Sequence, residues 1–159
     1  MSEVVSDASP LIVLAKAQLL DLIPKLFDRV LIPEAVLGEI QNGPADDPMR
    51  RLLPSSNWLV TVRLDAPLPS DTSPRLGGGE AAVLEYSRTH GNLPVVIDDR
   101  AARRRAQSLG LKVYGTLSLI AMAAAQGHTA SFTAAVQQLK AAGLYVSDDV
   151  IDAVRKMLK

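Results

Sequence analysis

Short apolar segments alternate with helix-forming segments along the chain, and this alternation limits the fold more than any other feature of the sequence. Strands separated by helices form parallel sheets, because each crossover helix returns the chain to the same end of the sheet. Helices then cover both faces, which makes the strands apolar on both sides. The sequence therefore predicts an α/β fold of three layers, α/β/α, with a central, mostly parallel sheet. The expected strands are Val4–Ser6, Val30–Ile32, Trp58–Val62, Leu93–Ile97 and Leu111–Tyr114.

The helical segments are marked by apolar periodicity and by start and stop residues. Ser9 and Thr116 are predicted to cap the helices that follow them, and Pro24 is predicted to interrupt the first helical segment. The region 44–79, rich in Pro, Ser and Asp, is predicted to be the loosest part of the chain. The expected helices are Leu11–Phe27, Glu34–Ile40, Pro48–Leu53, Glu80–His90, Arg100–Leu109, Leu117–Gln126, Thr129–Ala142 and Ser147–Leu158.

Composition narrows the class of protein. A chain of 159 residues, 48% hydrophobic, suits a single domain spanning 1–159. Because it has no cysteine, disulfides and thiolate-bound zinc are excluded, and carboxylates and histidines are the only strong metal ligands. Equal numbers of basic and acidic residues, 17 each, give no overall attraction to RNA or to an anionic membrane. With no signal peptide and no apolar run of ~20 residues, we expect a cytoplasmic protein without a membrane segment.

Four acidic residues stand where a metal ion can be bound. Asp7 and Asp98 directly follow strands, and Glu39 and Glu80 lie on helices that start near the sheet. Ligands of such sheets bind beyond the carboxyl ends of the strands, so Asp7 and Asp98 should face one crevice. Mg²⁺ and Mn²⁺ prefer carboxylate oxygens. The pattern favours an acidic metal site.

Each acidic residue also has a purely structural interpretation. Asp7, Asp98 or Asp99 can cap the helix that follows it. Two adjacent carboxylates at the end of a buried strand nevertheless exceed what one cap needs. Glu39 can be a solvated helix residue, and Glu80 can complement the positive end of a helix dipole. These alternatives remain open at the level of the single residue.

The motifs in their order resemble PIN-domain proteins, and in particular a prokaryotic PIN-like branch related to the toxins of VapBC-type toxin–antitoxin pairs. The resemblance is clearest over residues 3–127, whereas the C-terminal helices in 128–159 are less diagnostic. The motifs are Ser-Asp-Ala-Ser-Pro-Leu at 6–11, Ile-Pro-Glu-Ala-Val-Leu-Gly-Glu-Ile at 32–40, Gly-Gly-Glu-Ala-Ala-Val at 78–83 and Val-Ile-Asp-Asp-Arg-Ala-Ala-Arg at 96–103.

The resemblance implies a divalent-metal-dependent ribonuclease that hydrolyses RNA phosphodiester bonds with Mg²⁺ or Mn²⁺. It assigns catalytic and metal-binding roles to Asp7, Glu39, Glu80 and Asp98, with Asp99 as a further metal ligand. The chain departs from the toxins in carrying Glu80 where they usually have aspartate, and Asp98-Asp99-Arg100 in place of Thr-x-Asp. Implied partners are an RNA substrate, a cognate antitoxin whose tail covers the acidic cleft, and a second copy of the chain in a homodimer.

Two other features leave alternatives open. The apolar segments Leu11–Phe27 and Leu117–Ala125 suit either a homodimer surface or core packing. The arginines that follow the acidic strand end either bind phosphates or form a solvated face with ion pairs. These arginines are Arg100, Arg103, Arg104 and Arg105.

Competing functions find less support in the residues. A histidine-based ribonuclease needs two converging imidazoles, but His90 and His128 both stand beside glycines at predicted helix ends. Gly77-Gly78-Gly79 lacks the Lys-Ser/Thr of a phosphate-binding loop. A phosphorylated receiver domain needs a lysine after a late strand, whereas Lys112 precedes one. A catalytically silent PIN-like module that binds a partner remains the alternative to the nuclease.

Overall fold

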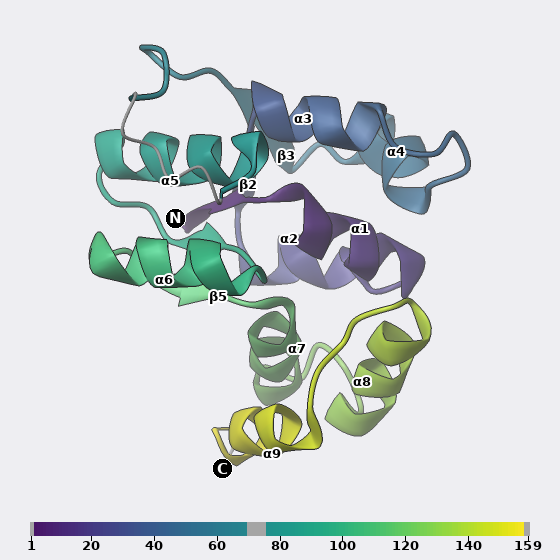
Figure 1. The fold of residues 1–159 in the computed structure, drawn as a ribbon. Coiled ribbons are helices and arrows are strands. Elements are labelled where there is room, and N and C mark those ends of the chain that lie inside the picture. Colours follow the sequence, from purple (N-terminus) through teal and green to yellow (C-terminus); the bar gives the residue numbers. More distant parts are fainter. Residues whose placement is uncertain (1, 70–75, 158–159) are drawn as a thin grey trace.

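The structure is a computed structural model that describes residues 2–69 and 76–157. Within these residues, five strands form one parallel sheet in the order β3-β2-β1-β4-β5. The strands are short, and the three-layer α/β/α arrangement predicted from the alternating segments is confirmed (Figure 1). The strands are β1 (Glu3–Ser6), β2 (Arg29–Pro33), β3 (Leu59–Val62), β4 (Val95–Val96) and β5 (Val113–Tyr114).

β1 is the central strand of the sheet, and the chain adds strands first on one side of it and then on the other. It first adds β2 and β3 on one side of β1, and then returns to add β4 and β5 on the other side. Val5 is therefore in register with Leu31 of β2 and with Val95 of β4. The backbone N–H of Asp7 donates to the carbonyl of Val96 at 3.0 Å. The carboxyl ends of β1 and β4 are neighbours at the switch point where open α/β sheets hold their ligands.

Helices cover both faces of the sheet. On one face α3 (Glu34–Gln41) packs against α5 (Gly78–Thr89), and α6 (Arg100–Ser108) lies beside α5 and β5 (Figure 1). The opposite face carries α1 (Ala8–Lys16) and α2 (Ile23–Leu26). α7 (Thr116–Ala125) packs against α2, α8 (Phe132–Ala141) and α9 (Asp148–Lys156). α4 (Pro48–Leu52) contacts α1 and α3, and the short 3-10 turns η1 (Leu20–Leu22) and η2 (Leu53–Ser55) complete the connections.

The core is continuous through these layers. Val5 and Val95 in the sheet and Ile97 directly after β4 are fully buried, and the apolar residues of α1 and α7 join the same hydrophobic cluster. Most of the apolar side chains in the predicted segments Leu11–Phe27 and Leu117–Ala125 therefore pack in the core. In the described part of the chain, no helix is long and apolar enough to cross a membrane.

Local predictions were wrong at the start of the first helical segment. α1 begins at Ala8 with Asp7 as its N-cap residue, so Ser9 is already helical and caps nothing. The interruption falls at Gln18, which adopts a left-handed φ of 61°, and not at Pro24. Pro24 instead sits in the first turn of α2, where its missing N–H costs no hydrogen bond. Residues 70–75 of the predicted loose region, and the predicted helix end at Leu158, lie outside the described residues.

Candidate active site

Asp7 lies at the end of the central strand and is almost entirely buried, with 4% of its surface exposed. Although it is the N-cap residue of α1, its side chain makes no capping hydrogen bond. The pKa of the Asp7 carboxyl is raised from 3.8 to about 6, mainly by burial. The charges of Glu39, Asp98 and Asp99 contribute to this rise, and a backbone hydrogen bond at Ala8 opposes it. The capping interpretation therefore fails for Asp7, which is held in an acidic environment.

Glu80 stands in the first turn of α5, and its Oε2 atom is buried without a hydrogen-bond partner among the described residues. Burial is also the main cause that raises the pKa of Glu80, here from 4.5 to about 7. The charges of Asp99, Asp7 and Glu39 add to the effect, as does a hydrogen bond with the side chain of Asp99. Because an unpaired buried oxygen is costly, this position suits a proton or a cation.

Glu39 reaches the site from α3, near the end of that helix. Its Oε1 atom accepts a hydrogen bond from the backbone N–H of Gly79 at 3.0 Å, which ties α3 to the start of α5. A Cβ atom at position 79 would lie 2.9 Å from Cδ of Glu39, so glycine is needed for this close approach. Sequence reasoning missed the role of Gly79, because the three glycines offered no sign of the helix that packs against them.

Asp98 is held by the start of α7. It accepts hydrogen bonds from the backbone N–H of Thr116 at 2.8 Å and from the Thr116 hydroxyl. The prediction that Thr116 caps its own helix was wrong, since Gly115 is the N-cap residue and the buried Thr116 side chain turns to Asp98 instead. These two bonds fix the carboxylate of Asp98 beside the end of β4.

Asp99 behaves as the structural interpretation predicted. Its side chain accepts a hydrogen bond from the backbone N–H of Ala102 at 2.9 Å and caps α6. The residue is exposed, and it influences Glu80 through charge and a hydrogen bond. Its role as a metal ligand stays a prediction.

The structure thus brings five carboxylates together, because Asp7 feels the charges of Glu39, Asp98 and Asp99, and Glu80 feels those of Asp7, Glu39 and Asp99. Across residues 2–69 and 76–157, however, no three acidic or histidine side chains form a ready-made set of metal ligands. The donor set is entirely carboxylate, which is the chemistry that Mg²⁺ and Mn²⁺ prefer. The raised pKa values and the unpartnered Oε2 of Glu80 fit a site in which a divalent cation takes the place of protons.

Basic side chains border this acidic site on α6. The Nη1 atom of Arg103 donates to the carbonyl of Ile97 at 3.2 Å, so this guanidinium is tied to the end of the sheet. Arg100, Arg104 and Arg105 are exposed, and none forms an ion pair within the described residues. The ion pairs of the solvated-face interpretation are thus absent from this part of the chain, and the guanidinium groups of Arg100 and Arg104 are open to an anionic ligand.

His90 ends α5 and has local structural contacts. Its Nδ1 atom lies 2.9 Å from the carbonyl of Tyr86, and its ring stacks on that of Tyr86 with the centroids 3.8 Å apart. His128 follows the end of α7. Both positions agree with structural roles at helix ends.

Comparison with known proteins supports the same family as the motifs. The family model described as "DUF3368: PIN domain" matches residues 3–159, and so extends over the C-terminal helices that the motifs do not reach. Among solved structures, a PilT N-terminus domain protein from the hyperthermophilic archaeon Sulfolobus solfataricus is similar, with a TM-score of 0.53 and 15% identity over 77% of this chain and 92% of that one. At this identity the likeness shows the fold alone. No curated protein matches the chain.

Proposed function

The chain belongs to the PIN-domain family, and from this premise we propose that it is a divalent-metal-dependent endoribonuclease. PIN domains are generally nucleases that use divalent metal ions. The observation that carries the proposal is the pair Asp7 and Glu80, two carboxylates with raised pKa values at the switch point of the sheet, one of which keeps a buried oxygen without a partner. Groups in such an environment gain most from a bound cation.

Asp7, Glu39, Glu80 and Asp98 would hold the metal, with Asp99 as a further ligand or as the residue that positions Glu80. Bound Mg²⁺ or Mn²⁺ supplies activation of water for in-line attack on phosphorus and stabilisation of the leaving oxygen. No side chain of the protein then needs to act as a nucleophile.

Hydrogen bonds within the chain orient two of the carboxylates that would hold the metal. Thr116 orients Asp98 through its backbone N–H and hydroxyl, and Gly79 orients Glu39 through its backbone N–H. Asp7 and Glu80 give up protons when a cation binds, because the pKa values of both carboxyls lie near neutral pH without one. Metal binding should therefore be coupled to pH.

We further propose that the enzyme is a cytoplasmic toxin of a type II toxin–antitoxin pair, inhibited by an antitoxin that covers the acidic cleft. The support is the resemblance of its motifs to VapBC-type toxins. A homodimer is proposed on the same ground. The apolar faces of α1 and α7 add little to that proposal, since most of their apolar residues are buried in the core of the chain itself.

A catalytically silent PIN-like module is the second candidate. It is favoured by the state of Asp98 and Asp99, whose carboxylates are already engaged by Thr116 and by the start of α6. Such a module would bind a partner without cleaving RNA.

Cleavage of a fluorescent RNA pool with Mg²⁺ or Mn²⁺ separates the two candidates. The nuclease predicts metal-dependent cleavage by the wild-type chain that falls by roughly 100-fold or more in Asp7→Asn and in Asp98→Asn, since each removes a charged ligand. Arg105→Ala, an exposed change on α6, is the matched control and should cleave normally. A wild-type chain that binds Mn²⁺ but cuts nothing would support the silent module.

A further inference from the structure

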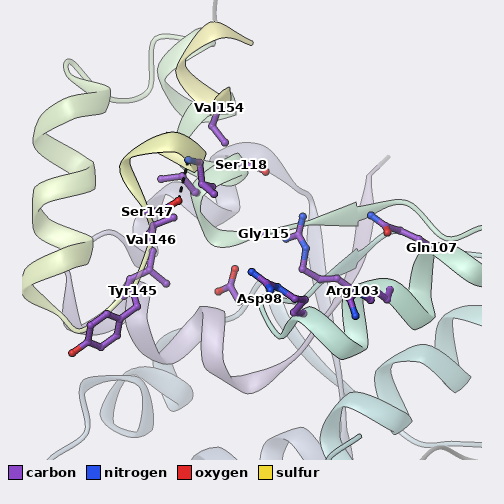
Figure 2. Close-up of a pocket in the computed structure, with 14 residues that line it drawn as sticks. Asp98, Arg103, Gln107, Gly115, Ser118, Tyr145, Val146, Ser147 and Val154 are labelled. Atoms are coloured by element: carbon purple, nitrogen blue, oxygen red, sulfur yellow. Dashed lines mark hydrogen bonds between the residues drawn. The ribbon is translucent and has the colours of Figure 1, made fainter. Parts of the chain in front are cut away.

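A cleft of about 500 Å³ opens on the far side of Asp98, between α6 and the segment that leads into α9 (Figure 2). We call it the α6–α9 cleft. Asp98, which also belongs to the acidic site, lies in its wall. Its volume falls in the range of small-molecule sites, roughly 300–1,000 Å³. Whatever fills this cleft therefore lies directly beside the proposed metal-binding residues.

One wall of the cleft is basic. Arg100, Arg103 and Arg104 line it from α6, and Asp98 is the single acidic residue among the lining side chains that the structure describes. Arg103 is tied to the carbonyl of Ile97, whereas Arg100 and Arg104 have no ion-pair partner among the described residues. Because unpaired guanidinium groups bind phosphate in a forked geometry, this wall suits a phosphate group.

The opposite wall is apolar with a polar edge. Leu117 of α7, and Val146 and Val150 beside the start of α9, line it. The hydroxyl of Ser118 makes no hydrogen bond in the described part of the chain and is available to a ligand. Figure 2 shows Tyr145 at the rim with its ring directed away from Asp98, and this residue is 99% exposed. An apolar surface with one free hydroxyl and an exposed aromatic ring suits a nucleobase better than a bare anion.

We propose that the α6–α9 cleft holds one nucleotide of single-stranded RNA, next to the phosphate that the acidic site cleaves. Arg100 and Arg104 bind the nucleotide's phosphate, and its base lies against Val146 and Val150. This inference rests on the proposed function, because the cleft joins the acidic site through Asp98. It also supplies the local positive patch that a chain of zero net charge needs for binding a polyanion.

Binding of a short fluorescent single-stranded RNA, followed by anisotropy in EDTA, tests the cleft without cleavage. The double variant Arg100→Ala/Arg104→Ala should bind about 10-fold more weakly than wild type. Its slope of log K against log salt should be smaller by about 0.7, because both arginines bind the same phosphate. Arg105→Ala is the matched control, because Arg105 lies on the same helix but does not line the cleft. It should bind RNA as the wild type does.

The base-binding wall is tested with Val150→Ser and two probes. RNA should bind this variant about threefold more weakly, whereas inorganic polyphosphate, which has no bases, should bind it as it binds the wild type. Equal weakening of both probes would show that the wall does not recognise a base and would overturn that half of the proposal.

The outcomes separate this inference from the nuclease itself. If the wild-type chain cleaves RNA but the double arginine variant binds RNA unchanged, the cleft proposal is wrong and the nuclease stands. If the wild-type chain never cleaves but loses RNA binding in the double variant, the cleft stands and the nuclease fails. If Arg105→Ala weakens RNA binding as much as the double variant does, the loss reflects the overall positive charge of α6 and not the cleft, and the proposed site is wrong.

Discussion

Two turns of this molecule share one sequence pattern, a strand followed by an aspartate and a helix, yet their aspartates differ. Asp7, in the turn between β1 and α1, is buried, caps nothing and has a raised pKa. Asp99, in the turn between β4 and α6, is exposed and caps its helix. Asp7 still belongs to the sheet ladder through its N–H, whereas Asp99 stands one residue beyond Asp98 and outside that ladder. Position relative to the sheet thus decides whether the aspartate caps its helix or is buried with a raised pKa.

The largest expected effect concerns the pH dependence of stability at Asp7. The folded pKa of this carboxyl, about 6, lies above the unfolded value of 3.8, so the folded state keeps the proton longer. The free energy of unfolding of the metal-free chain should therefore fall as pH rises from about 4 to about 6, by on the order of 3 kcal/mol from this group alone. Urea unfolding in EDTA at several pH values measures it.

Asp7→Asn is the matched variant for this measurement, because it keeps the shape and removes the titration. Its stability should lose this part of the pH dependence and exceed that of the wild type near neutral pH. If the free energy of unfolding depends on pH in the same way in both proteins, Asp7 does not have a raised pKa and does not differ from Asp99 in this respect. With Mn²⁺ near pH 6, calorimetry in buffers of different ionisation heat should show proton release by the wild type that Asp7→Asn reduces.

An intermediate effect is expected at the contact between α3 and α5. Gly79→Ala places a methyl group against the carboxylate of Glu39, which is exposed and can swing away. Stability should change little, but Glu39 leaves its position, and Mn²⁺ affinity measured by calorimetry should fall by roughly tenfold. Gly78→Ala, where a Cβ meets nothing within 4 Å, is the control and should bind metal normally. Equal affinities for both variants would exclude Glu39 from the site.

The smallest effect is expected at Asp99. Asp99→Ala removes the cap of α6 and should destabilise the protein by about 1 kcal/mol in thermal or urea unfolding, while Asp99→Asn, which caps as well, should not. RNA cleavage by Asp99→Asn reports on its second role. Near-normal cleavage would leave Asp99 as a cap, and a loss similar to that of Asp7→Asn would place it among the metal ligands.

The fold was predictable from the sequence because its evidence is local and repeated. Apolar strand segments, such as Val30–Ile32, alternate with helices that have their own start and stop residues. Strands that alternate with helices form a parallel sheet covered by helices, so the layers follow from this pattern. The positions of Asp7 and Asp98 at strand ends followed from the same rule. Family membership was visible in the order of the motifs.

What the sequence could not supply depends on contacts between distant elements. Thr116 and Asp98 belong to different connections, so nothing local distinguishes a threonine that caps a helix from one that donates to an aspartate across the sheet. The contact of Gly79 with Glu39 likewise exists only after α3 and α5 have packed. The left-handed Gln18 was missed because glycine and asparagine are the usual signals for that conformation.

The central position of β1 also has a consequence for synthesis. β1 acquires its partner β4 only when Val95 and Val96 have been made, and Asp98 meets Thr116 later still. Such long-range pairing is slow to form and leaves a nascent strand exposed. Asp98 is therefore not held in place before Thr116 has been made, and a chain cut short before this residue lacks the arrangement on which the proposed cleavage would depend.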